Sequence, residues 1–166
     1  MTLRDTDDEF MEHQRDRIRD TYLSTTDRPR STAQGVHHIA LLSSDVERTV
    51  NFYQELLGFP LTEIHENRDY QGSHQFFFDI GHGNLLAFFD VPGLDLGPYK
   101  EVLGGLHHLA ISVSREQWEA AKERLDAAGI GYLEESGASL YFSDPDGTRL
   151  ELLAAPLGKM YGRHIL

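Results

Sequence analysis

The chain contains the heptapeptide GVHHIAL at residues 35–41 and a close copy, GLHHLAI, at residues 105–111. In both copies, two adjacent histidines enter a short apolar run of the kind that forms a buried β-strand. The segments that follow also correspond, because each contains one helical pattern and then three short strand-like runs. A unit of this length that cannot close a core alone is expected to pair with its twin. The repeat therefore predicts an α+β fold of two paired βαβββ modules.

The first module is expected to span about residues 35–92. After the strand at 36–43, its helix is predicted over SDVERTVNFYQELLGF, where Ser44 or Asp45 can cap the first turn and Gly58 ends the helix. Its remaining strands are predicted at residues 60–66, 74–80 and 84–91, with a GHG turn between the last two.

The second module is expected to span about residues 105–155, after a linker rich in glycine and proline, PGLDLGPYKEVLGG. It repeats the order with a strand at 106–114, a helix at 115–129 and strands at 130–136, 138–144 and 148–156. The DPDG turn precedes the last strand, and its Asp144 and Asp146 are interpreted as turn residues. Residues 1–34 are expected to form a charged N-terminal helical extension and a linker, and residues 156–166 a C-terminal tail.

Composition excludes several functions. The chain has 166 residues, with 27 acidic against 15 basic side chains and a formal net charge of -12, which disfavours binding to nucleic acids or anionic lipid. It has no cysteine, so any metal must be held by histidine and carboxylate. The sequence also shows no membrane span and no secretory signal, which predicts a cytoplasmic protein acting on a small molecule.

Strand alternation predicts which histidine of each pair belongs to a site. Successive side chains of a strand face opposite sides, so only one histidine per pair can point to the same surface. The bulkier residues Ile39 and Leu41 are expected to pack under the helix together with His37, which leaves His38 on the opposite face. By the same parity His108 faces the cavity between the modules and His107, like His37, is structural.

A carboxylate completes the predicted metal site. When the last strands of the two modules are aligned on their turn glycines, Glu151 falls opposite Ala87. Glu151 stands inside the apolar run LELLAA, where an unpaired carboxylate is costly to bury and therefore needs a cation. Two histidines and one carboxylate on one face form a ligand set for Fe(II), Mn(II) or a similar divalent ion. The sequence therefore predicts metal ligands His38, His108 and Glu151.

Over residues 35–155 the chain resembles the vicinal oxygen chelate superfamily, which includes glyoxalase I, bleomycin-resistance proteins, extradiol dioxygenases and fosfomycin-thiol transferases. The resemblance rests on HHIAL, DVERTVNFYQELLGF, HHLAISV and DPDGTRLELL. It implies βαβββ modules whose sheets curl into a cup around a divalent metal, the same three ligands, and a homodimer. Among the members, extradiol dioxygenases are the preferred comparison, which implies Fe(II), with Mn(II), Zn(II) or Ni(II) as alternatives.

The dioxygenase comparison implies two further site residues. Those enzymes commonly place a tyrosine ten residues before the glutamate, where this chain has Tyr141. They also carry a histidine near the start of the strand that here begins at Asn84, so His74 or His82 on neighbouring segments is the expected substitute. Tyr141 and His74 are therefore the candidate catalytic residues. Of the five phenylalanines at 76–78 and 88–89, two are expected to face the cavity.

Three alternatives stay open beside the oxygenase. A glyoxalase-like lyase or isomerase would need a second glutamate where the chain has Ala87. A thiol transferase is suggested by the run GASLYFSDPDGTRLEL, with Ser139 and Tyr141, although Ala40 and the acidic Glu134 and Glu135 depart from that pattern. A non-catalytic binding or resistance protein, as among the bleomycin-resistance members, would typically lack the metal triad.

Overall fold

The computed structural model describes residues 5–23, 26 and 28–166. It divides into two compact units, Met1–Gly35 and Val36–Leu166. The first unit contains the helix α1 (Asp5–Tyr22), whose apolar residues Phe10 and Ile18 are exposed. A helix is therefore present in the segment where a charged helical extension is predicted. Within the described residues, no helix combines the length and the apolar composition needed to cross a bilayer.

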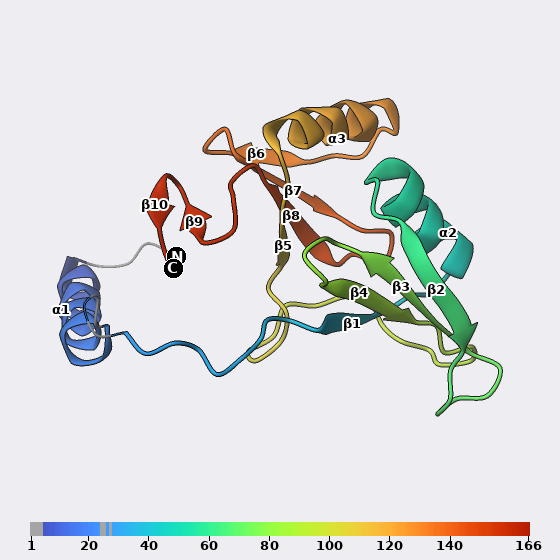
Figure 1. Cartoon of the computed structure of the whole chain (residues 1–166), viewed down its shortest axis with the longest axis horizontal. Helices are drawn as coiled ribbons and strands as arrows, with labels where there is room; N and C mark the ends of the chain where they lie inside the picture. Colours follow the sequence, from blue (N-terminus) through green and yellow to red (C-terminus); the bar gives the residue numbers. More distant parts are fainter. Residues whose placement is uncertain (1–4, 24–25, 27) are drawn as a thin grey trace. The chain divides into compact units, whose positions relative to one another are not determined.

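The second unit contains two four-stranded mixed sheets with the same topology (Figure 1). In the first sheet the strand order is β1-β4-β3-β2, with β1 parallel to β4 and the other neighbours antiparallel. Its elements are β1 (His38–Leu42), α2 (Val46–Val50), the π-helical turn η1 (Asn51–Leu56), β2 (Leu61–Glu66), β3 (His74–Asp79) and β4 (Leu85–Phe89).

The second sheet repeats this arrangement in the order β5-β8-β7-β6, again with only its first pair parallel. Its elements are β5 (Leu109–Ser112), α3 (Arg115–Ala127), β6 (Leu133–Glu135), β7 (Ser139–Ser143) and β8 (Arg149–Leu153). The predicted order βαβββ is thus confirmed in both halves. The strands are shorter than predicted at one or both ends, because residues beside the turns do not join the ladder.

The helix boundaries follow from the local sequence. The side chain of Asp45, not that of Ser44, accepts the backbone N–H of Arg48 and caps α2. At the other end, Gly58 takes a φ of 79°, a left-handed conformation that glycine adopts without steric cost. Between them the helix continues as a π-helical turn, which the sequence pattern did not predict.

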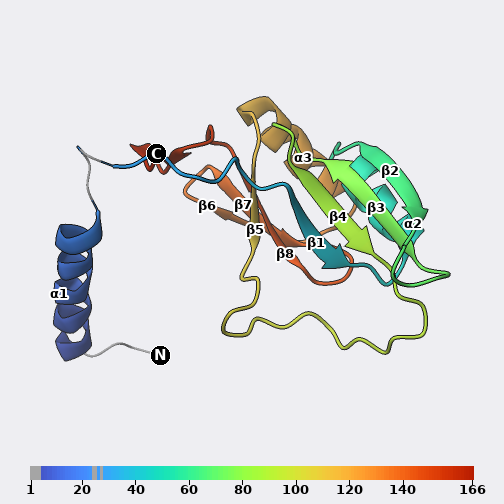
Figure 2. The same ribbon diagram turned by 60° about the horizontal axis from the view of Figure 1, so that its bottom comes forward.

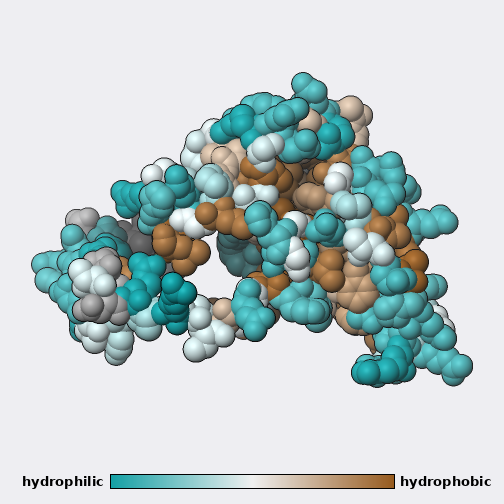
Figure 3. Space-filling view, in the orientation of Figure 1, coloured by the Kyte–Doolittle hydropathy of each residue, from teal (hydrophilic) through white to brown (hydrophobic). Residues whose placement is uncertain are grey.

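One face of each sheet packs against the helices and forms a continuous hydrophobic core. Figure 1 shows α3 beside the second sheet and α2 beside the first, and Figure 3 shows hydrophobic surface below the hydrophilic outer side of α3. The ring of Tyr53 of η1 packs at a tilt against Phe78 and Phe88, and Trp118 of α3 is 1% exposed. Phe76, Phe78 and Phe88 are fully buried, whereas Phe77 and Phe89 are only partly buried, so two of the five phenylalanines face away from the core.

The two modules are also joined by polar contacts. Tyr53 donates a hydrogen bond to Asp144 at 3.0 Å, and both side chains are buried. Asp146 accepts the backbone N–H of Ser44 at 3.1 Å and pairs with Arg48 at 3.0 Å. The aspartates of the DPDG turn therefore do more than shape the turn, because they connect the second module to the helix start of the first.

Two irregular segments flank the second module. Figure 2 shows the chain between β4 and β5, residues 90–108, as a long loop with no helix or strand. After β8 the C-terminal residues form a small hairpin, β9 (Lys159–Met160) and β10 (Arg163–His164), where only a tail is predicted.

Candidate metal centre

The face of each sheet that turns away from the helices is called its outer face here. In the second sheet Leu150 and Leu152 point into the core, so the alternating residues Arg149 and Glu151 lie on the outer face. Strand register then sets Glu151 beside Tyr141 of β7 and Ala110 of β5. Polar side chains therefore lie together on the outer face of the second sheet, whereas its other face is apolar.

Two of the three predicted metal ligands meet on this face. His108 Nε2 lies 3.1 Å from Glu151 Oε2, and the glutamate is 1% exposed. The other carboxylate oxygen, Oε1, is buried with no hydrogen-bond partner among the described residues. A buried carboxylate with an unsatisfied oxygen is costly unless a cation lies beside it. The donor set therefore fits a divalent metal that binds imidazole nitrogen and carboxylate oxygen.

Tyr141 and Arg149 extend the cluster. The Tyr141 ring packs edge-on against His108, with ring centroids 5.6 Å apart. The Arg149 guanidinium lies 4.9 Å from the centroid of Tyr141 and 3.7 Å from Glu101 of the linker. Burial, followed by the negative charge of Glu151, raises the pKa of Tyr141 to about 12. The tyrosine hydroxyl is therefore protonated at neutral pH and can donate a proton or a hydrogen bond.

The third predicted ligand lies elsewhere in the chain. His38 is on the outer face of the first sheet, paired with Leu85 of β4, and is exposed. No group of three His, Asp or Glu side chains within the described residues is arranged to hold a metal. A single copy of the chain therefore brings together His108 and Glu151 but not His38.

The outer face of the first sheet is apolar where the second sheet is polar. Ala87 takes the place of Glu151 and is paired with Ala40 on one side and Phe77 on the other. The sequence alignment of Ala87 with Glu151 is thus matched by equivalent strand positions. This face has His38 as a potential ligand but no carboxylate beside it.

The residues proposed as substitutes for a second histidine lie away from the outer face. His74 shares the face of Phe76 and Phe78 by alternation, and its Nδ1 lies 3.1 Å from Asp90. His82 is an exposed turn residue with a φ of 55°, while Asn84 donates to the carbonyl of Gly81.

Two residues that the sequence reasoning missed lie on the outer faces. His65 of β2 lies 3.3 Å from Gln75 and its ring is 5.8 Å from that of Phe77. Arg149 stands two positions before Glu151, and that spacing on a strand could have revealed that both share a face. His65 could not be found this way, because β2 has an irregular register between Leu61 and Glu63.

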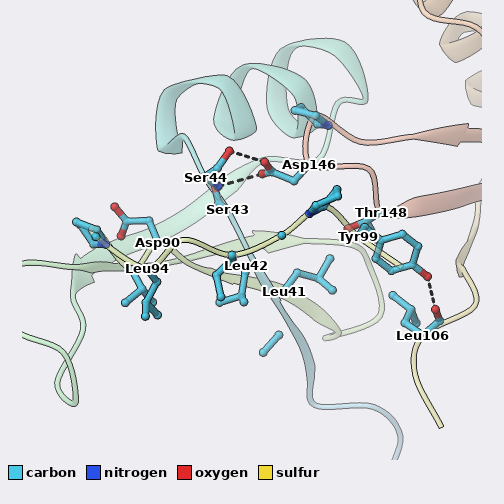
Figure 4. Close-up of a pocket in the computed structure, with 18 residues that line it drawn as sticks. Leu41, Leu42, Ser43, Ser44, Asp90, Leu94, Tyr99, Leu106, Asp146 and Thr148 are labelled. Carbon is cyan, nitrogen blue, oxygen red and sulfur yellow. Dashed lines mark hydrogen bonds between the residues drawn. The ribbon is translucent and has the colours of Figure 1, made fainter. Parts of the chain in front are cut away.

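A cavity of about 680 Å³ adjoins the cluster. Tyr141 and Arg149 line it from the second sheet and Tyr99 and Glu101 from the linker, so it offers one aromatic wall and one cation. Figure 4 shows a different cavity of about 780 Å³, between β1 and the linker, lined largely by apolar side chains such as Leu42, Leu94 and Leu106. Tyr141 and Arg149 of the polar cluster line the first cavity and not this one, so the first cavity is the better candidate for chemistry.

Comparisons with known proteins all indicate one protein family. The family model described as Glyoxalase/Bleomycin resistance protein/Dioxygenase superfamily matches residues 35–152. The putative ring-cleaving dioxygenase MhqA of Bacillus subtilis (strain 168) is 26% identical over 136 residues, 77% of this chain and 42% of MhqA. The glutathione transferase FosA of Serratia marcescens is 30% identical over 122 residues, 72% of this chain and 79% of FosA.

Solved structures agree on the fold. The glyoxylase/bleomycin resistance protein/dioxygenase domain from Frankia sp. EAN1pec superposes with a TM-score of 0.65 at 23% identity, covering 75% of this chain and 100% of that domain. This chain spans less than half of MhqA but most of FosA and all of the Frankia domain. The chain belongs to the glyoxalase, bleomycin resistance protein and dioxygenase superfamily, whose members are also called vicinal oxygen chelate proteins.

Proposed function

We propose that the protein is a metal-dependent oxygenase that acts on a small catechol-like molecule through two adjacent oxygens. The observation that carries this proposal is the contact of His108 with the buried Glu151, whose carboxylate keeps one oxygen without a hydrogen-bond partner among the described residues. Members of the superfamily are mostly metal-dependent enzymes and bind divalent metals. With imidazole and carboxylate as donors, Fe(II) is the preferred ion, with Mn(II), Zn(II) and Ni(II) as alternatives.

The third ligand in this proposal is His38 of a second copy of the chain. Within one copy, the modules pack through their helix sides, as the contact between Phe52 of η1 and Phe142 of β7 illustrates. This packing leaves both outer faces uncovered, with Leu42 49% and Leu133 52% exposed. A homodimer that apposes the first outer face of one copy to the second outer face of the other would bring His38 to His108 and Glu151.

The bound metal would act as a Lewis acid that stabilises negative charge on the two adjacent substrate oxygens. The chain's own residues orient the substrate and handle its protons. Tyr141, protonated at neutral pH, can hold a proton on its hydroxyl and donate it to an oxygen anion. Arg149 can bind an anionic substituent, because guanidinium groups pair well with carboxylates, and here it would exchange Glu101 for the substrate.

The single carboxylate favours an oxygenase over an isomerase. Moving a proton between two carbon atoms requires a base on each side of the substrate or one that reaches both. In the first module the position equivalent to Glu151 is Ala87, surrounded by Ala40 and Phe77. A tyrosine with a pKa of about 12 is protonated at neutral pH and cannot accept a proton there, so Tyr141 does not replace the missing carboxylate as a base.

A thiol transferase is the second candidate, favoured by a polar row along β7 and β8. Ser139 is fully buried, and its hydroxyl has no hydrogen-bond partner among the described residues. It stands two positions before Tyr141 on the same face of β7, and the Arg149 guanidinium lies over the Tyr141 ring. Such a row could bind an anionic substrate beside the metal, and FosA is among the relatives.

Elemental analysis of protein purified without added metal, combined with oxygen uptake, tests the proposal. We expect one iron per site, bound by the wild type and lost in Glu151→Gln, and oxygen consumption with at least one substituted catechol. Zinc or nickel as the sole metal, without oxygen uptake for any catechol tested, would overturn the oxygenase. Transfer of a thiol to an epoxide with Mn(II) bound would support the second candidate, and absence of any bound metal would favour a non-catalytic binding protein.

A further inference from the structure

The two histidine pairs have the same geometry in both modules. His37 Nδ1 lies 2.9 Å from His38 Nδ1, and the two rings meet at 78° with centroids 5.1 Å apart. His107 Nδ1 lies 2.6 Å from His108 Nδ1, with the rings at 73° and 4.9 Å apart. Sequence parity predicts that His37 and His107 lie with the core residues, but both are exposed. Burial therefore does not explain why these rings contact their neighbours.

The position of the pairs in the chain explains how the rings meet. β1 begins at His38 and β5 at Leu109, so the first histidine of each pair precedes its strand, and in the second module His108 precedes it as well. Side chains alternate strictly only within a strand, so this histidine is free to turn toward the next residue. Since Nδ1 is the ring nitrogen nearer the backbone, neighbouring rings meet through Nδ1. The outer nitrogen, Nε2, of His108 then remains directed at Glu151.

Which nitrogen of the His108 ring carries the proton decides whether the His107 ring donates or accepts the hydrogen bond between them. A neutral His108 that donates Nε2–H to Glu151 has only a lone pair on Nδ1, so His107 must donate to it. A metal on Nε2 instead requires the His108 proton to be on Nδ1, and His107 must then accept. A neutral imidazole can exchange these roles by changing tautomer, whereas a carboxylate only accepts and an ammonium only donates.

We propose that His107, and His37 by the same geometry, are positioning residues that orient the ligand histidines and present Nε2 to the metal. This inference rests on the proposed function, since it assigns a role to the neighbours of two proposed ligands. The internal repeat provides the independent support. The first module keeps the pair although Ala87 leaves no carboxylate near it, which is expected if His38 serves a site completed by another copy.

Metal binding by the full-length, metal-stripped protein tests the role of His107. Titration with Zn²⁺ and Mn²⁺ as probes should show His107→Phe binding about 10- to 100-fold more weakly than wild type, as for other residues that orient a ligand histidine. His107→Asn should recover most of the affinity, because an amide can also donate or accept. His13→Phe, which removes an exposed histidine from α1, is the matched control and should bind like wild type.

A second readout does not depend on metal. In ¹⁵N spectra of the metal-free protein at pH 8, the His108 ring nitrogens should shift in His107→Phe and return toward wild-type positions in His107→Asn. Equal affinities for wild type and His107→Phe, or unchanged His108 ring signals, would overturn the positioning role. If the wild type binds neither probe metal, the proposed function fails, while the ring signals still decide whether His107 orients His108.

Discussion

At the scale of single residues, Glu151 is a carboxyl side chain that is almost completely buried. The carboxylate is 1% exposed, one oxygen faces His108, and the other has no partner among the described residues. Burying an ionised group without full compensation costs several kcal/mol. Such a residue lowers the stability of the metal-free protein and should regain that energy when a cation binds.

Replacing this glutamate by glutamine should therefore change stability and binding in opposite directions. Glu151→Gln keeps the shape but removes the charge, so the metal-free variant should be about 1 to 3 kcal/mol more stable than the metal-free wild type. Metal should raise the melting temperature of the wild type but not of the variant. Calorimetry of both proteins with and without Zn²⁺ measures this. A metal-free variant less stable than wild type would contradict this account of the site.

Element by element, much of the fold could be predicted because it rests on periodicity. The parity of β1 set Ile39 and Leu41 against the core, and the repeat gave both modules the same order. The predicted burial of His37 and His107 was wrong, because both residues lie before the paired strand and side chains alternate strictly only within it. The separation of His38 from Glu151 could not be predicted either, since strand patterns do not specify how two modules of one chain pack.

The alternation of β3 can be tested on two adjacent phenylalanines. Phe78 is fully buried beside Tyr53, whereas Phe77 faces the outer side of the sheet beside Ala87. Phe78→Ala should lower the free energy of unfolding by about 3 to 5 kcal/mol, the usual cost of removing a core aromatic ring. Phe77→Ala should cost much less and instead alter substrate binding. Urea denaturation of both variants provides the comparison, and equal losses would show that the assigned faces are wrong.

A second test at this scale concerns the bond between the modules. Tyr53→Phe removes the hydrogen bond to Asp144 and should cost about 1 to 3 kcal/mol, because the acceptor is buried and charged. Tyr70→Phe, at an exposed tyrosine, is the control and should be neutral. Denaturation of the two variants at pH 7 checks the prediction. A loss in Tyr70→Phe as large as that in Tyr53→Phe would count against a specific bond.

The same bond should give a characteristic alkaline response. Burial and the nearby Asp144 carboxylate raise the pKa of Tyr53 well above its usual value of 10.0. A folded pKa above the unfolded one means that the stability linked to protonation is fully present below pH 10 and is lost as pH rises beyond it. Wild type should therefore lose stability above pH 10 more steeply than Tyr53→Phe, which cannot ionise. Parallel curves measured from pH 8 to 11 would argue against this linkage.

At the scale of the whole molecule, one chain contains both parts of the site that we propose to be shared between two copies. The second sheet has a histidine, a carboxylate, a tyrosine and an arginine on its outer face, while the first offers His38 on an apolar face. Because the modules share a core on their helix sides, neither outer face is covered by the other module of the same chain. A symmetric pair of chains would cover both faces and make two equivalent sites, because a two-fold axis repeats every contact between the copies.

Mixing two defective variants can show whether a site is shared between copies. His38→Ala and Glu151→Gln should each fail to bind metal alone. In a mixed dimer of the two, one site combines both defects, but the other receives intact His38 from one copy and intact His108 and Glu151 from the other. Half of the refolded dimers are mixed, and each mixed dimer has one intact site of two. Unfolding and refolding an equimolar mixture should therefore restore about one quarter of the metal content of the wild type.

A mixture of His108→Ala with Glu151→Gln is the control, because both defects lie on the same half of the site and no intact combination can form. Metal content after refolding measures both mixtures, and restoration in neither would show that His38 does not complete the site from a second copy.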